Sequence, residues 1–152
     1  MSNKVKTLEI LQQVITGLEG QSLTHRYEAK LFAAAGFSKL AEKYADHATE
    51  ERDFADKFID RLLDLGGELK QGGAPVAPLT DDIVEFLKYD QKTSVDGLKL
   101  IGDILDSGDL DLNTYELMKE YYLDEEEDMY WTDNQLELID AIGKQNYLVK
   151  ML

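Results

Sequence analysis

Six acidic or imidazole side chains lie at positions where an amphipathic helix facing a protein core would carry apolar residues. These residues are His25, His47, Glu51, Asp90, Glu125 and Asp128. Each falls near the middle of a predicted helix, and no Lys or Arg shares their faces. A buried carboxylate costs on the order of several kcal/mol unless it is paired, protonated or bound to a metal ion. Carboxylates and imidazoles that converge from several helices therefore predict an internal site for a divalent metal.

Each of these residues also has a plainer interpretation. A single core histidine is more often a structural hydrogen-bonding residue than a metal ligand. Glu51 would be exposed if the helix were turned by one residue, as is expected of its neighbour Glu50. The run DEEED at 124–128 places an acid on any helix face, so Glu125 alone is weak support. What favours the metal site is that all six positions fall at one level of four helices.

The hydrophobic pattern predicts the helices that must position these residues. Apolar residues recur with helical period along the chain, and the alternation typical of strands is absent. The predicted helices cover about residues 4–35, 38–65, 80–108, 113–142 and 144–152. Between the second and third lies the segment 66–80, which holds both prolines, Pro75 and Pro78, and is long enough to run the length of a bundle. We expect one all-α domain over 1–152, with a four-helix bundle over about 4–142, one long crossover and a short terminal helix.

Polar residues near the expected helix starts suggest the caps. Ser38 is a candidate N-cap for the second helix, and Thr80 with the acids after it is a good start for the third. Asn113 with Glu116 three residues later fits a capping box for the fourth. Glycines follow the ends of the first, third and fourth helices, in keeping with their use as helix terminators.

Charge and composition narrow the range of partners. The 152 residues include 16 Lys and Arg against 31 Asp and Glu, a formal net charge of −15. This excess of acids argues against nucleic acid and against anionic membranes, and it favours a cationic partner such as a metal ion. Because the chain has no cysteine, thiolate metal sites and Cys nucleophiles are excluded. With no long apolar stretch, a cytoplasmic protein is expected.

Several segments resemble one known family. They are RYEAKLFAAAGFSKL, HATEERDFADKFIDRLLDLGG, the DGLK around Gly97, Trp131 after the acidic run, and the terminal GKQNYL. On these residues the chain resembles the bacterioferritins of the ferritin-like superfamily over nearly its whole length. The resemblance implies a ferritin-like bundle, assembly of a hollow shell, iron storage, and oxidation of Fe²⁺ at a di-iron site within each subunit. It also implies cytoplasmic iron homeostasis as the setting.

The metal ligands of that family are only partly present. The family uses a Glu on helix one, Glu-x-x-His on helix two, a Glu on helix three and Glu-x-x-His on helix four. The corresponding positions here are Leu18, Glu51, Phe54, Ser94, Glu125 and Asp128. Only the two bridging carboxylates, Glu51 and Glu125, are retained. Arg52 stands where the family has its haem-ligating methionine, which argues against haem binding in the family manner.

One interpretation is a metal site moved by one helical turn. His47 lies four residues before Glu51, Asp90 four before Ser94, and Asp128 three after Glu125. Given the expected directions of the helices, all three residues are displaced toward the same end of the bundle. The set His47, Glu51, Glu125 and Asp128, completed by His25 or Asp90, would hold one or two iron ions, or manganese or zinc. Such a site would oxidise Fe²⁺ with O₂ or peroxide as a ferroxidase, with Glu51 and Glu125 as its catalytic ligands.

The other interpretation is a site that has lost its metal. Leu18 and Phe54 then fill the space left by the ligands, and the chain is a structural shell subunit that assembles with itself or with an active ferritin-like partner. The retained inward acids and imidazoles favour the moved site, because decay would leave an apolar core. A third interpretation, other di-metal chemistry in the bundle, has no specific signal in the sequence.

Overall fold

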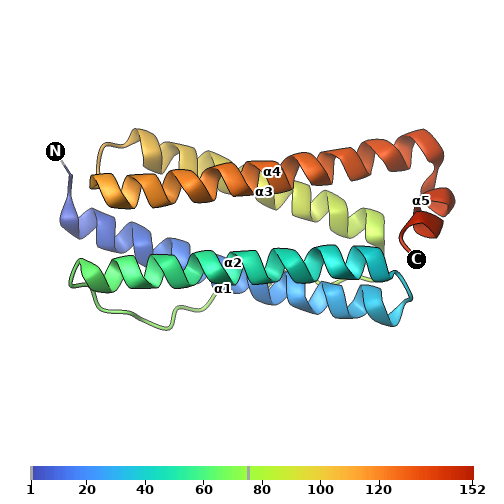
Figure 1. The fold of residues 1–152 in the computed structure, drawn as a ribbon, viewed down its shortest axis with the longest axis horizontal. Helices are drawn as coiled ribbons and strands as arrows, with labels where there is room; N and C mark the ends of the chain where they lie inside the picture. Colours follow the sequence, from blue (N-terminus) through green and yellow to red (C-terminus); the bar gives the residue numbers. More distant parts are fainter. Residues whose placement is uncertain (1, 75) are drawn as a thin grey trace.

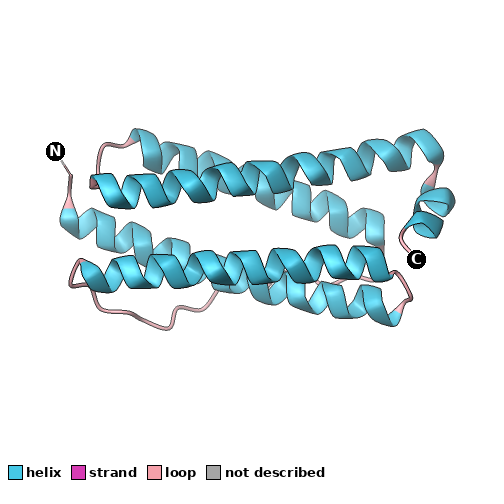
Figure 2. Ribbon diagram, in the orientation of Figure 1, coloured by secondary structure: helices cyan, strands magenta, loops and turns pink. Residues whose placement is uncertain are grey.

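Five helices follow one another along the chain at the places that the periodicity predicts. The computed structural model describes residues 2–74 and 76–152, so Pro75 of the predicted loop lies outside the described residues. The helices are α1 (Lys4–Ala34), α2 (Ser38–Asp64), α3 (Ile83–Asp106), α4 (Leu112–Ile142) and α5 (Lys144–Lys150). Within the described residues there is no strand (Figure 2). The predicted all-α bundle with a short fifth helix is confirmed.

The helices form two antiparallel pairs, α1 with α2 and α3 with α4 (Figure 1). The crossover from α2 returns along the length of the bundle before α3 begins, so α2 and α3 run in the same direction. At the far end, the N–H of Lys39 in α2 donates to the carbonyl of Met151, 3.1 Å away, just after α5. None of the helices in the described part of the chain is long and apolar enough to span a bilayer.

The crossover is attached to α1 at both of its ends. Gln12 exchanges two hydrogen bonds with the backbone of Lys70, at 2.9 and 3.0 Å. The N–H of Thr80 donates to Oε1 of the buried Glu28 at 2.8 Å. Between these points the chain approaches α1 so closely that a Cβ on Gly20 would overlap the Cβ of Ala74. The side chain of Glu28 thus fixes the entry into α3.

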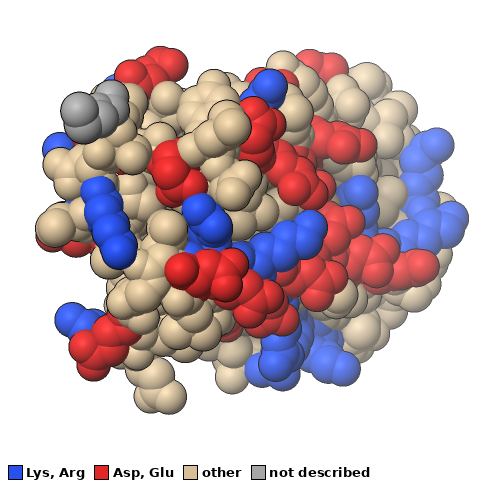
Figure 3. Space-filling model, turned by 60° about the vertical axis from the view of Figure 1, so that its left-hand side comes forward, with Lys and Arg blue, Asp and Glu red and all other residues tan. Residues whose placement is uncertain are grey.

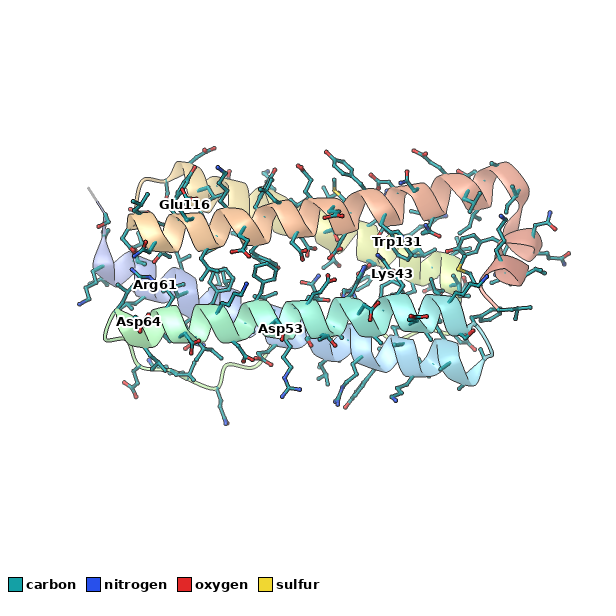
Figure 4. The ribbon with its side chains drawn as sticks, viewed as in Figure 1. Lys43, Asp53, Arg61, Asp64, Glu116 and Trp131 are labelled. Atoms are coloured by element: carbon teal, nitrogen blue, oxygen red, sulfur yellow. The ribbon has the colours of Figure 1, made fainter. Side chains whose placement is uncertain are left out.

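Two of the expected helix caps are wrong. Ser38 is the first residue of α2, and the N-cap position belongs to Phe37, which makes no side-chain cap. For α4 the cap is Asp111, which accepts from the N–H of Thr114 at 3.3 Å, so Asn113 lies inside the helix. Asp111 is selected by a contact with another helix, because Arg61 Nη2 of α2 donates to Asp111 Oδ2 at 2.6 Å. Arg61 lies near the end of α2 in Figure 4. At α3 the cap is Asp82, within the predicted start.

The core consists of two apolar clusters with a polar layer between them. One cluster includes Leu11, Leu18, Phe54, Phe58 and Met118 and lies toward the N-terminus of α1. The other contains Phe32, Tyr44, Phe86, Ile139 and Tyr147 and lies toward α5. On α4 the buried face includes Tyr121, which is 6 % exposed, while Tyr122 is only partly buried. The polar layer between these clusters holds the predicted site residues.

Candidate metal centre

The bundle interior gathers the predicted polar residues at one level. His25 comes from α1, His47 and Glu51 from α2, Asp90 from α3, and Glu125 and Asp128 from α4. The first five are buried, and the Asp128 side chain is 16 % exposed. Helical spacing explains the alignment, because residues three or four apart lie on one helix face. The side-chain contacts divide the six residues into three groups.

The first group is centred on His25, which lies between two carboxylates. Its Nδ1 is in short contact with Oε1 of Glu51, and its Nε2 lies 2.6 Å from Oδ1 of Asp90. The hydroxyl of Tyr44 donates to Oδ2 of Asp90 at 3.1 Å. Both ring nitrogens can donate to carboxylates only when the imidazole carries a proton on each nitrogen. The contacts fit a buried imidazolium cation between Glu51 and Asp90.

The pKa shifts agree with this arrangement. Burial alone would lower the pKa of His25, but the charges and hydrogen bonds of Glu51 and Asp90 outweigh it and raise that pKa well above its usual value. Burial would raise the pKa of Asp90, yet His25 and Tyr44 together hold it below its usual value. Burial raises the pKa of Glu51 to about 7 against the opposing charge of His25. Because Asp90 accepts from two donors and Glu51 from one, Asp90 is the main counter-ion of His25.

The second group surrounds Glu125. Its Oε1 accepts from the Ser94 hydroxyl at 3.1 Å and from Gln21 Nε2 at 3.4 Å. Burial raises the pKa of Glu125, and the nearby charge of Asp90 adds to this effect. Leu18 and Phe54 are buried in the adjacent apolar cluster. At the family's dinuclear position the chain thus offers three carboxylates (Glu51, Glu125 and Asp128), a hydroxyl and hydrocarbon, and no imidazole, a poorer donor set than a pair of metal ions has in the family.

The third group is His47 with Asp128. Nε2 of His47 lies 3.6 Å from Oδ1 of Asp128, too far for a hydrogen bond, and has no partner among the described residues. Burial, reinforced by the charge of His25, lowers the pKa of His47 to about 4, so its ring is neutral at pH 7. Oε2 of Glu51 is the other unpartnered atom of this layer. A neutral imidazole with a free nitrogen is competent as a metal ligand.

A carboxylate cluster that the sequence analysis did not predict lies on the outer side of this layer. Oxygen atoms of Glu50, Asp124 and Asp128 lie within 4.8 Å of one another. It is the only group of three such ligand types at this spacing that the described residues form. Glu50 was expected simply to be exposed. The sequence does contain an indication of the cluster, because Glu50 lies three residues after His47 and Asp128 lies four residues after Asp124, so each pair shares one helix face.

A cavity of about 300 Å³ connects the interior with the surface beside the crossover. It lies between α1 and α3, and its wall includes His25, Asp90 and Glu125 as well as Gly17 and Gly97. No atom lies within 4 Å of a Cβ built on either glycine, so their lack of side chains leaves the passage open. The cavity therefore lies against the His25 layer.

Comparison with known proteins agrees with the fold and the sequence pattern. The model of the ferritin-like domain family matches residues 11–142. The bacterial ferritin of Neisseria meningitidis serogroup B is 31% identical over the whole of both chains, and that of Pseudomonas aeruginosa is 28% identical over 97% of each. The structure of Rhodobacter capsulatus bacterioferritin, described with a metal-free dinuclear site and haem iron, superimposes with a TM-score of 0.91. The two sequences are 24% identical, and the superposition covers 99% of this chain and 96% of the Rhodobacter capsulatus chain.

Proposed function

This chain belongs to the ferritin-like domain family, among the bacterioferritins, and from that premise we propose that it is an iron-storing subunit of an oligomeric shell. At the bundle centre, the positive charge of protonated His25, and not a di-iron centre, balances the buried carboxylates. Stored iron is the cargo of the assembly and not a resident cofactor of the bundle. The chain builds the shell and its acidic surfaces, alone or together with a ferritin-like partner that oxidises Fe²⁺.

The single observation that carries the proposal is the pairing of His25 with Glu51 and Asp90. A metal ion would supply positive charge to the carboxylates of a bundle, and here a protonated imidazole already supplies it. Glu51, one of the two retained bridging carboxylates, is thereby engaged. Without the ligands that Leu18, Phe54 and Ser94 have replaced, rapid oxidation at a di-iron centre is not supported.

Assembly into a shell is supported by apolar side chains that the isolated chain leaves uncovered. Leu23, Tyr27 and Leu31 recur every four residues on α1 with 45, 46 and 39 % of their surface exposed. Val76 on the crossover is 98 % exposed. Exposed apolar residues grouped in this way are typical of protein–protein interfaces.

In light scattering, the purified chain is expected to give a mass many times that of its 17.2 kDa monomer. Tyr27→Glu places a charge in the apolar stripe of α1 and is expected to reduce that mass. Asp64→Asn, an exposed change at the end of α2 and off this stripe, is the matched control and should leave the mass unchanged. A monomer or dimer at every concentration would rule out the shell.

Aerobic addition of Fe²⁺ is expected to produce ferric absorbance no faster than in a solution of buffer alone. The physical reason is that the bundle centre lacks a donor set for two iron ions. A fast initial phase that saturates at one or two Fe²⁺ per chain would contradict this part of the proposal. The shell and storage role would be unaffected by that result, because assembly is measured separately.

A second candidate, oxidation of Fe²⁺ at the moved site, is favoured by the two unpartnered buried atoms Nε2 of His47 and Oε2 of Glu51. With Glu125 and Asp128 they supply one imidazole and three carboxylates, a set suited to iron, manganese or zinc. A fast phase that is lost in both Glu51→Ala and Glu125→Ala would support this candidate over the first.

A further inference from the structure

The cavity between α1 and α3 has the size of a site for a small organic molecule. These two helices belong to different antiparallel pairs, and the crossover that runs beside α1 contributes Ala74 and Ala77 to the cavity wall (Figure 1). The cavity volume is about 300 Å³. An engineered protein cavity of about 150 Å³ holds one benzene molecule, so this one has room for a ring that carries a short polar arm.

Much of the cavity wall is hydrocarbon. Its apolar side chains come from three helices and include Val14, Leu18, Leu100, Ile101 and Tyr121. An apolar body gains free energy when it leaves water for such a wall, whereas a hydrated ion gains nothing from it. The lining therefore favours an organic ligand over a bare ion.

The charged side chains of the wall favour a cation. They are His25, Asp90 and Glu125, and no Lys or Arg is among the described residues that line the cavity. Both ring nitrogens of His25 contact the carboxylates of Glu51 and Asp90, which balance its charge. Glu125 therefore remains as an additional buried acid. Acidic side chains also cover much of the face drawn in Figure 3, and they raise the concentration of cations near the chain.

Several polar atoms in the wall are available only as hydrogen-bond acceptors. Glu125 is 3 % exposed and accepts through Oε1 alone, from Ser94 and Gln21. Its Oε2 has no donor among the described residues and is not sealed from solvent. Thr24 and Thr93, also in the wall, donate their hydroxyl protons to backbone carbonyls one turn earlier, which leaves lone pairs on their oxygens free to accept. A group rich in N–H donors complements this arrangement.

We propose that the cavity between α1 and α3 binds one small primary ammonium ion with an apolar body, such as a single ring joined to a methylammonium group. The ammonium donates to Oε2 of Glu125, and the apolar body lies against the hydrocarbon of α1 and α3. Gly17 and Gly97 leave room for it, because no atom lies within 4 Å of a Cβ built on either. An anion of the same size is repelled, and a neutral analogue lacks the charge-assisted hydrogen bond.

Titration of the purified chain with benzylammonium, followed by ligand-observed NMR with a chelator present, tests the site. Saturable binding of one benzylammonium per chain is expected. Benzyl alcohol, which has the same ring and no charge, should bind at least about tenfold more weakly. Benzoate, the anion of similar size, should show no saturable binding.

Two substitutions separate the charge of the site from its space. Glu125→Gln is expected to weaken benzylammonium binding at least about tenfold and to leave the binding of benzyl alcohol unchanged. Gly97→Leu fills the cavity and should abolish the binding of both molecules. A leucine is a better helix former than glycine, so this variant is expected to keep its fold.

Two matched controls exclude general charge attraction and a general effect on α3. Asp64→Asn removes an exposed acid at the end of α2, far from the cavity, and should leave benzylammonium binding unchanged (Figure 4). Val95→Leu places a leucine at an exposed position of α3 outside the cavity wall and should also leave it unchanged. Equal affinity for benzylammonium and benzyl alcohol would overturn the proposal, as would binding that survives Glu125→Gln or Gly97→Leu, or no binding at all. Neither shell assembly nor iron oxidation enters this measurement.

Discussion

Replacing His25 by leucine is expected to lower the free energy of unfolding by about 3–5 kcal/mol, the usual consequence of removing one partner from a buried ion pair. The imidazolium lies between Glu51 and Asp90, and its removal leaves both carboxylates buried with only the Tyr44 hydroxyl as a donor. The change is measured by urea unfolding at pH 6.5 in the presence of a chelator. The loss should shrink at lower pH, where the two carboxyls take up protons.

The same substitution at the neighbouring histidine is the matched control. The rings of His25 and His47 lie 5.8 Å apart in the same layer, but His47 is neutral and unpartnered. His47→Leu is therefore expected to leave the stability of the metal-free protein nearly unchanged or to raise it. Adding Glu51→Gln and Asp90→Asn to His25→Leu should recover most of the lost stability. If the two leucine variants are equally stable, His25 is not the internal cation of the bundle.

The arrangement of helices could be predicted because glycines, prolines and apolar period all mark the same boundaries. Helix α4, for example, ends at Gly143, whose φ of 83° favours glycine. The polar layer was also predictable, since His25, Asp90 and Glu125 interrupt apolar stripes at one level. The exact caps were not, because several residues in the run before α4 can cap a helix and the contact of Arg61 with Asp111 selects one of them.

The pairing within the polar layer could not be predicted from the stripes. Helical spacing places His25, His47 and Glu51 on inward faces, but it does not say which imidazole lies between carboxylates and which is left unpartnered. That choice depends on side-chain rotamers and on the relative rotation of four helices. Glu50 was missed for a related reason, because it is one position away from the buried stripe and faces the groove between α2 and α4 only at the level of Asp128.

The stability of the metal-free protein is expected to fall as the pH rises from 6.5 to 8. Burial, followed by the charges of Glu125 and Asp124, raises the pKa of Asp128 from an ordinary 3.8 to about 8. The pKa of His25 is raised above its ordinary 6.5. A group whose pKa is higher in the folded protein binds more protons there than in the unfolded chain. Its contribution is therefore fully present below the unfolded pKa and is lost as the pH rises through the folded pKa.

The opposing contributions lie at lower pH. The pKa of His47 is lowered to about 4, so this residue makes stability rise with pH, but only between about 4 and its ordinary 6.5. Glu51, with a pKa raised to about 7, acts in the same direction as Asp128. Above pH 6.5 the raised pKa values of Asp128, Glu51 and His25 all act in the same direction, and each proton that only the folded chain holds corresponds to about 1.4 kcal/mol per pH unit.

Urea midpoints at pH 6.5, 7.25 and 8, measured with a chelator present, test this slope. Asp128→Asn removes one of these titrations and is expected to reduce the slope, while Asp64→Asn should leave it as in the unmodified chain. A stability that is constant or rises over this range would show that the folded protein does not hold these protons. The part of the slope that survives Asp128→Asn reports the protons that the folded chain keeps on His25 and Glu51.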